Sequence, residues 1–341
     1  MILACALGVR EPVLTAETSA LLKEARPWGL ILFREACKTP TQVRALTEDL
    51  REACGHDAIV WIDQEGGRVA RLKPPAWPLW PAALRYGALY EKDPEAGLEA
   101  AWLGHRLIAH ELKAIGVNGD FAPVLDVPAD GSDPIIGDRA FGLDAHTAAL
   151  LGGAALQGLR EGGVAGCVKH IPGHGRADVD SHIGLPRVGE GMNALAIDIA
   201  PFRALAPQAE AAMTAHIVYA ALDPTRPATQ SPIVIDFIRN DIGFQGLLIS
   251  DDLDMNALSG TLAKRAAAAF DAGCDLVIQC SGVASDMALT AEAAPALQGE
   301  ALARAQLVEA VARQSAGDFD AAEAWWRFRA LMGADVGLKL A

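Results

Sequence analysis

The sequence predicts an α/β protein that folds as a single (β/α)8 barrel, a TIM barrel, over residues 1–341. Eight short apolar runs alternate with longer segments of helical pattern from one end of the chain to the other, which is typical of a parallel sheet. The runs are almost wholly apolar, as expected when both faces of each strand are covered. An open, doubly wound sheet is the alternative, but no Gly-rich dinucleotide fingerprint follows the first run.

The expected elements follow one another without a break in composition, which favours one domain. The strands are expected at residues 2–7, 29–33, 58–63, 117–125, 164–170, 211–217, 247–252 and 274–280. Helices are expected at 39–53, 97–115, 144–160, 192–204 and 260–272, several of them starting at a Thr or Asp suited to capping. Residues 73–81 form a Pro- and Trp-rich loop, and 318–338 a terminal helix. Trp325 and Trp326 in that helix are expected to pack against the barrel.

The charge balance argues against nucleic acid as a partner. With 43 acidic and 29 basic residues the formal net charge is −14, so a polyanion would be repelled at long range. A neutral or locally neutralised substrate fits this balance better. The six cysteines include no C-x-x-C pair and are expected to be small buried residues rather than metal or redox sites.

The location and assembly of the protein are inferred from what the sequence lacks. No Lys or Arg precedes Arg10, and no long charge-free apolar run follows, so neither an export signal nor a membrane span is expected. We therefore expect a cytoplasmic protein that needs no cofactor. We also expect a monomer, since a barrel of this size can stand alone.

Polar residues gather where the expected strands end. They stand at residues 63–68 after the third strand, at 169–170 and 216 at the ends of the fifth and sixth, and at 250–252 in the seventh, while Asp126 and Arg139 follow the fourth. Active sites of this architecture lie at the carboxyl ends of the strands. The sequence therefore predicts a polar site at the mouth of the barrel.

The seventh strand ends in three closely spaced carboxylates, Asp251, Asp252 and Asp254. Alternation along a strand sends Asp251 and Asp252 to opposite faces, so one of the two is expected to face the barrel mouth. The residues alone leave open which one. The alternative is that these carboxylates cap the following helix.

A Gly-containing loop with three histidines and two aspartates leaves the fifth strand at residues 169–182. Such a loop can move over a bound substrate. Its histidines and aspartates could hold a metal ion, although a Gly-rich loop preorganises ligands poorly. The pair Asp180 and His182 fits an acid/base unit better, because the carboxylate can hold the imidazole in one tautomer.

Lys169, His170 and Asp63 stand at strand ends, where charged groups are costly unless they meet water or a ligand. We expect them to bind hydroxyl groups of a ligand, and the arginines at 68 and 71 to orient carbonyl or carboxylate groups. The alternatives are a purely structural His170 and a plain salt bridge between Asp63 and one of the arginines.

Three motifs together resemble the bacterial β-N-acetylglucosaminidases of glycoside hydrolase family 3. They are WIDQEGGRVARL at residues 61–72, KHIPGHG at 169–175 with DSH at 180–182, and SDDLDM at 250–255. IGDRAF at 136–141 resembles the family's fourth-strand loop. One departure is Ile171, where the family usually has an aromatic residue, and this change is expected to alter packing rather than chemistry.

The resemblance implies a retaining hydrolase that releases terminal β-linked N-acetylglucosamine, with muropeptides from peptidoglycan as the implied substrate. Asp251 would be the nucleophile, His182 the general acid/base and Asp180 its partner. The positions that match sugar-binding residues of the family are Asp63, Arg71, Arg139, Lys169 and His170. Two rival functions stay open: a glycoside phosphorylase that uses the same site, and a catalytically silent sugar-binding barrel.

Overall fold

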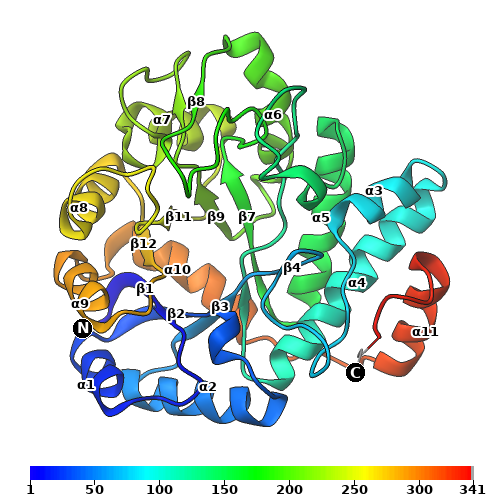
Figure 1. The fold of residues 1–341 in the computed structure, drawn as a ribbon, viewed down its shortest axis with the longest axis horizontal. Helices are drawn as coiled ribbons and strands as arrows, with labels where there is room; N and C mark the ends of the chain where they lie inside the picture. The colour runs from blue at the N-terminus through cyan, green and yellow to red at the C-terminus, as the bar shows by residue number, and fades with distance from the viewer. Residues whose placement is uncertain (339–341) are drawn as a thin grey trace.

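Eight parallel strands close into a barrel in the computed structural model, which describes residues 1–338. Around the barrel the order is β1, β12, β11, β9, β7, β6, β3 and β2, and β2 pairs again with β1. Figure 1 shows these strands at the centre with the helices around them. The predicted (β/α)8 fold is confirmed. The predicted domain end at residue 341 lies outside the described residues.

The barrel strands are β1 Leu3–Val9, β2 Pro27–Leu32, β3 Ile59–Ile62, β6 Gly119–Asp120, β7 Ala165–Ile171, β9 Ala211–Thr214, β11 Leu247–Asp252 and β12 Leu276–Gln279. Two small additional sheets pair β4 Gln64–Gly66 with β5 Val69–Ala70, and β8 Arg187–Val188 with β10 Val218–Tyr219. The helices are α1 Ala16–Ala25, α2 Pro40–Cys54, α3 Ala83–Tyr90, α4 Pro94–Ala114, α5 Ala145–Glu161, α6 Met192–Leu205, α7 Pro232–Phe237, α8 Leu262–Ala272, α9 Ala284–Ala293, α10 Gly299–Ala312 and α11 Ala321–Met332.

The core has two parts, divided by the wall of the barrel. Inside the barrel, alternate strand residues such as Ile59, Trp61 and Ile249 pack together, and Trp61 stacks on Phe121 with ring centroids 4.8 Å apart. The residues between them, such as Leu248, face the surrounding helices. Helix α10 adds Val308 and its neighbours to the inner cluster and passes behind the strands in Figure 1, so it closes one end of the barrel.

Several helices start where the sequence predicts. Thr39 caps α2 by accepting a hydrogen bond from the Gln42 N–H, and Asp144 caps α5 by accepting one from the Thr147 N–H at 2.9 Å. Each cap satisfies a backbone donor that the first helical turn leaves without a partner. The six cysteines are all free and buried, as expected.

The fourth strand is shorter than predicted. Only Gly119–Asp120 is regular, and the segment beyond it pairs with β7 at the isolated bridge between Val124 and Lys169. Pro123 lies in this stretch and has no N–H to give to a strand ladder, so the apolar run continues without forming a regular strand.

The terminal helix is in place, but one of its two tryptophans is not in the core. Trp325 packs on Trp80 with ring centroids 4.9 Å apart, whereas the side chain of Trp326 is 69% exposed. The two neighbours point to different sides of α11, so only one can face the barrel. The prediction that both pack was wrong for Trp326. Within residues 1–338, no helix combines the length and the apolar character needed to cross a bilayer.

Candidate active site

The inner face of the barrel continues into polar residues at its mouth. On β11, Leu247 and Ile249 belong to the inner cluster, so the next residue on the same face is Asp251. The same alternation on β7 leads from Cys167 to Lys169, and on β3 from Trp61 to Asp63. Asp251, rather than Asp252, therefore faces the mouth.

A chain of alternating charges crosses this mouth. Arg71 Nη2 lies 2.9 Å from Asp63 Oδ2, and Lys169 Nζ lies 2.9 Å from Asp63 Oδ1. Lys169 Nζ also lies 2.7 Å from Glu65 Oε1, and Arg139 holds both oxygens of Glu65 at 2.8 Å. The pairing is bidentate only between Arg139 and Glu65, which fixes the plane of that carboxylate.

Glu65 also lines the pocket at the barrel mouth, although no role was predicted for it from its place in the motif at residues 61–72. It is buried, and it is tied to Lys169 and Arg139. Burial alone would raise its pKa, but the two cations lower it to about 2; the pKa of Asp63 is likewise held below its ordinary value by Lys169 and Arg71. Both carboxylates are therefore ionised at neutral pH and can accept hydrogen bonds.

Asp120 lies in β6 close to this network and differs from it. It is fully buried, its Oδ1 accepts a hydrogen bond from the Gln64 N–H at 2.9 Å, and its Oδ2 has no partner. Burial raises the pKa of Asp120 to about 8. Its role is thus to hold the start of β4, the strand that carries Glu65, in place.

His170 is held by Asp126, a carboxylate expected after the fourth strand. Its Nδ1 lies 2.7 Å from Asp126 Oδ2, and Asp126 Oδ1 accepts hydrogen bonds from the backbone N–H groups of His170 and His174. A carboxylate at Nδ1 fixes the tautomer and leaves Nε2 for a ligand. The structural and the ligand-binding interpretations of His170 are therefore compatible.

The three aspartates at the end of β11 have different surroundings. Asp251 Oδ1 accepts a hydrogen bond from the Asp252 N–H at 2.8 Å; burial would raise the pKa of Asp251, but His216, His170 and this bond lower it. Asp254 accepts from the N–H groups of Cys280 and Ser281, and Asp252 also accepts from Cys280. Asp252 and Asp254 thus organise the loop, whereas Asp251 is ionised and faces the mouth.

The Asp180–His182 pair lies on the loop after β7, which we call the histidine loop (residues 172–186). His182 Nδ1 lies 2.8 Å from Asp180 Oδ1, and the side chain of His182 is 67% exposed. The loop is fastened beside the nucleophile candidate, because Ser181 O accepts from the Ala257 N–H and His182 O accepts from Asn256 Nδ2.

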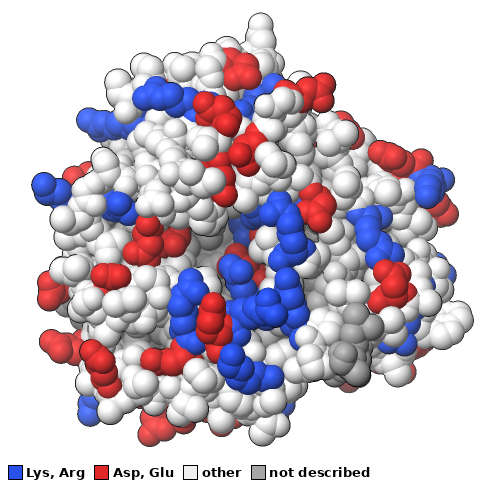
Figure 2. Space-filling model, viewed as in Figure 1, with Lys and Arg blue, Asp and Glu red and all other residues white. Residues whose placement is uncertain are grey.

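These side chains share one pocket of about 450 Å³, within the range of small-ligand sites. Seven of the eight predicted site residues line it: Asp63, Arg71, Arg139, Lys169, His170, His182 and Asp251. Asp180 does not line it but holds His182. Figure 2 shows a hollow at the centre of the face, with Lys and Arg gathered beside it.

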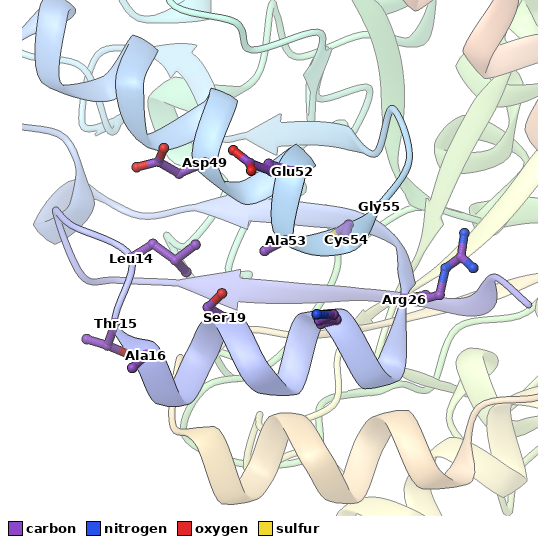
Figure 3. A pocket seen from close by; sticks show the side chains of 11 residues that line it. Leu14, Thr15, Ala16, Ser19, Arg26, Asp49, Glu52, Ala53, Cys54 and Gly55 are labelled. Carbon is purple, nitrogen blue, oxygen red and sulfur yellow. The ribbon is translucent and has the colours of Figure 1, made fainter.

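A second hollow, of about 800 Å³, lies between α1 and α2 (Figure 3). Its lining includes Lys23, Asp49 and Glu52 and none of the predicted site residues. The metal interpretation of the histidine loop finds no support within residues 1–338, where no three His, Cys, Asp or Glu side chains are grouped as ligands of one ion.

Known proteins resemble this chain in both sequence and fold. Residues 7–315 match the glycosyl hydrolase family 3 N-terminal domain. A β-hexosaminidase of Alkalilimnicola ehrlichii is 40% identical over 283 residues, which cover 81% of this chain and 80% of that protein. Native NagZ from Neisseria gonorrhoeae is 32% identical with a TM-score of 0.79, covering 97% of this chain and 98% of that one. The same protein has been solved with N-trifluoroacetyl-D-glucosamine bound, at the same identity and TM-score. The chain belongs to glycosyl hydrolase family 3.

Proposed function

We propose that this protein is a retaining β-N-acetylhexosaminidase that releases terminal β-linked N-acetylglucosamine from muropeptides of peptidoglycan. One observation carries the proposal: Asp251, His182 and the five predicted sugar-binding residues line a single pocket. The activity agrees with the β-hexosaminidase relative, and the sugar agrees with the N-acyl-glucosamine bound to NagZ.

In the first step, an oxygen of the Asp251 carboxylate attacks the anomeric carbon of the sugar. The bond from that carbon to the leaving oxygen breaks, and protonated His182 gives its Nε2 proton to that oxygen. Asp180 stays hydrogen-bonded to His182 Nδ1 and stabilises the imidazolium before transfer. The low pKa of Asp251 keeps the nucleophile ionised.

In the second step, water attacks the anomeric carbon of the glycosyl-aspartate while neutral His182 takes its proton. The bond to Asp251 breaks and the carboxylate is regenerated. Two inversions give net retention of configuration. Asp63, Arg71, Lys169, His170 and Arg139 hold the hydroxyl and acetamido groups of the sugar during both steps.

The covalent step is tested by trapping. A fluorinated slow substrate should leave a glycosyl label on the peptide that contains Asp251, detected by mass spectrometry. Asp251→Asn should lower kcat by several orders of magnitude and leave the melting temperature unchanged. The matched change Asp254→Asn, at a loop-organising carboxylate, should lower stability more than activity. Label on Asp252, or on no residue of the protein, would refute the assignment of the nucleophile.

The substrate class is tested with nitrophenyl β-N-acetylglucosaminide, β-glucoside and β-xyloside side by side, and we expect preference for the first. Product analysis with and without phosphate separates hydrolysis from the phosphorylase alternative. Binding of the first compound without turnover would favour the silent barrel. The cytoplasmic location and the monomeric state stay predictions from the sequence.

A further inference from the structure

Lys and Arg side chains gather on one side of the barrel mouth, although the whole chain is acidic. If the net charge of −14 were spread evenly over the surface, it would repel an anionic substrate and favour a neutral one. Figure 2 instead shows Lys and Arg side chains clustered beside the central hollow, with few acidic side chains among them. Because exposed charges act over about 10 Å at ordinary ionic strength, this local cluster dominates the field that a ligand meets at the mouth.

A separate pocket of about 450 Å³ adjoins the sugar pocket on this basic side; we call it the rim pocket. It is lined by residues 34, 35, 37 and 38, by Arg71 and by residues 73–77, and it shares Arg34, Glu35 and Arg71 with the sugar pocket. Trp77 and the prolines at 74 and 75 give it an apolar wall. The two pockets are therefore continuous around Arg71.

The cations of the rim pocket outnumber its carboxylates. Glu35 is its sole acidic lining residue, and Glu35 Oε2 already pairs with Arg10 Nη1 at 3.3 Å. Arg71 pairs with Asp63. Among the described residues, Arg34, Lys38 and Lys73 form no ion pair, and Lys73 Nζ donates only to the Arg68 carbonyl at 3.0 Å. Three positive charges thus face the pocket without a partner.

The simplest alternative is a solvated basic surface, since Arg34 and Lys38 are exposed. Lys73 argues against this alternative, because it is half-buried and its pKa is lowered by burial and by Arg34 and Arg71. Cations close to a partly buried lysine destabilise its charged form unless an anion neutralises them. The position of the cluster, continuous with the sugar pocket, places such an anion on the substrate.

We propose that the rim pocket binds a carboxylate on the aglycone of the substrate and that Lys38 and Lys73 determine specificity for this anionic group. The inference rests on the proposed function, which makes the aglycone the part of the substrate outside the sugar pocket. Inorganic phosphate is a different source of negative charge. Neither Asp251 nor His182 lines the rim pocket, so an anion held there is remote from the reacting carbon and is not an acceptor.

The experiment compares two ligands with N-acetylglucosamine β-1,4-linked to N-acetylmuramoyl-L-alanine, one with the free alanine carboxylate and one with its carboxamide. Dissociation constants are measured by calorimetry in the Asp251→Asn background, so the readout does not depend on turnover. We expect the carboxylate to bind about tenfold more tightly, and this preference to shrink as salt rises from about 0.01 to 1 M. Lys38→Gln and Lys73→Gln together should abolish the preference and leave carboxamide binding unchanged.

The matched control is Lys23→Gln, which removes the same charge at the exposed groove between α1 and α2 (Figure 3) and should leave the preference intact. The proposal would be overturned if the Asp251→Asn protein with both lysines intact bound the carboxylate and the carboxamide equally well. Equal weakening of both ligands by the double lysine variant would also overturn it. So would formation of glycosyl phosphate by the wild type that depends on Lys38 and Lys73. Activity on nitrophenyl β-N-acetylglucosaminide is assayed separately, so failure of the proposed function is distinguished from failure of the rim pocket.

Discussion

At the scale of single residues, the acid/base candidate differs from the rest of the site in its exposure. The Asp63–Lys169–Glu65 network is buried, whereas most of the His182 side chain is exposed and it is held by a carboxylate of its own loop. The two parts therefore do different work. In the proposed mechanism the buried network gives a fixed frame for the sugar, and the exposed imidazole reaches a leaving group that differs from one substrate to another.

This division predicts a dependence on the leaving group. His182→Ala should lower kcat by about 10²–10⁴-fold for a disaccharide, whose leaving alcohol needs a proton. It should slow glycosylation by a dinitrophenyl glycoside far less, because that leaving group departs as an anion. Asp180→Ala should act in the same direction to a smaller extent. Steady-state and pre-steady-state rates with both substrates give the measurement.

The control for this prediction is His146→Ala, an exposed histidine at the start of α5. It should leave both rates unchanged. Added azide should restore turnover of the dinitrophenyl glycoside by His182→Ala, since azide attacks without base assistance. An equal loss for both leaving groups would mean that His182 positions the substrate and does not transfer a proton.

At the scale of elements, the histidine loop depends on its packing against the segment after β6. Gly175 O accepts from the Ala129 N–H at 2.9 Å, and a Cβ added at Gly175 would lie 1.8 Å from Val127 O. No side chain fits there without moving the loop. The backbone of residues 127–129 thus sets the position from which the loop carries His182 to the mouth.

Gly175→Ala should therefore displace the loop and lower kcat/KM by about 10²-fold, because small misplacement of a catalytic group is costly. Binding of free N-acetylglucosamine should weaken much less, since most of the proposed sugar-binding residues lie on other segments. Gly184→Ala is the matched control on the same loop, where an added Cβ meets no atom within 4 Å. Similar kinetics for the two variants would show that the loop tolerates the shift.

The elements also show what a single sequence can and cannot predict. Eight apolar runs and the polar residues at their ends are enough to predict the barrel and its mouth. The runs are apolar on both faces, so their pattern does not tell which face is inward, and the residues alone left Asp251 and Asp252 equivalent. Packing of Leu247 and Ile249 inside the barrel makes the distinction.

Glu65 and the fourth strand were missed for related reasons. Glu65 belongs to the short hairpin of β4 and β5, in which Gly66 and Gly67 have φ of 99° and 55° and turn the chain back. The two glycines signal that turn, but the partners of Glu65 come from distant segments. In the fourth strand, a single Pro within an apolar run outweighed the hydrophobic pattern.

At the scale of the whole molecule, buried ionisable groups shift the stability with pH in opposite directions. Burial lowers the pKa of His105 and His174 to about 4, so these groups make the folded protein more stable as pH rises from about 4 to 6.5. Burial raises the pKa of Asp120 to about 8 and that of Asp252 to about 7. These acids have the opposite effect, because the folded state keeps a proton that the unfolded chain loses.

The direction of the pH effect of Asp120 follows from the proton that the folded state retains. Its pKa is 3.8 in the reference state and about 8 when folded, so between these values unfolding releases a proton and its contribution to stability falls as pH rises. Asp120→Asn replaces the protonated acid by a neutral side chain of the same shape, and Asn Oδ1 can still accept from the Gln64 N–H. The variant should therefore gain stability relative to the wild type as pH rises from 5 to 7.5, by up to about 1.4 kcal/mol per pH unit.

The measurement is the free energy of unfolding in denaturant at several pH values for both proteins, since the difference between them removes the contribution of the histidines. Asp49→Asn, at an exposed position on α2, is the matched control and should give a pH-independent difference. A pH-independent difference for Asp120→Asn as well would mean that Asp120 is ionised in the folded protein. Asp120 would then be a third buried negative charge beside Asp63 and Glu65. The three cations that pair with this network, Arg71, Lys169 and Arg139, would be balanced without a ligand.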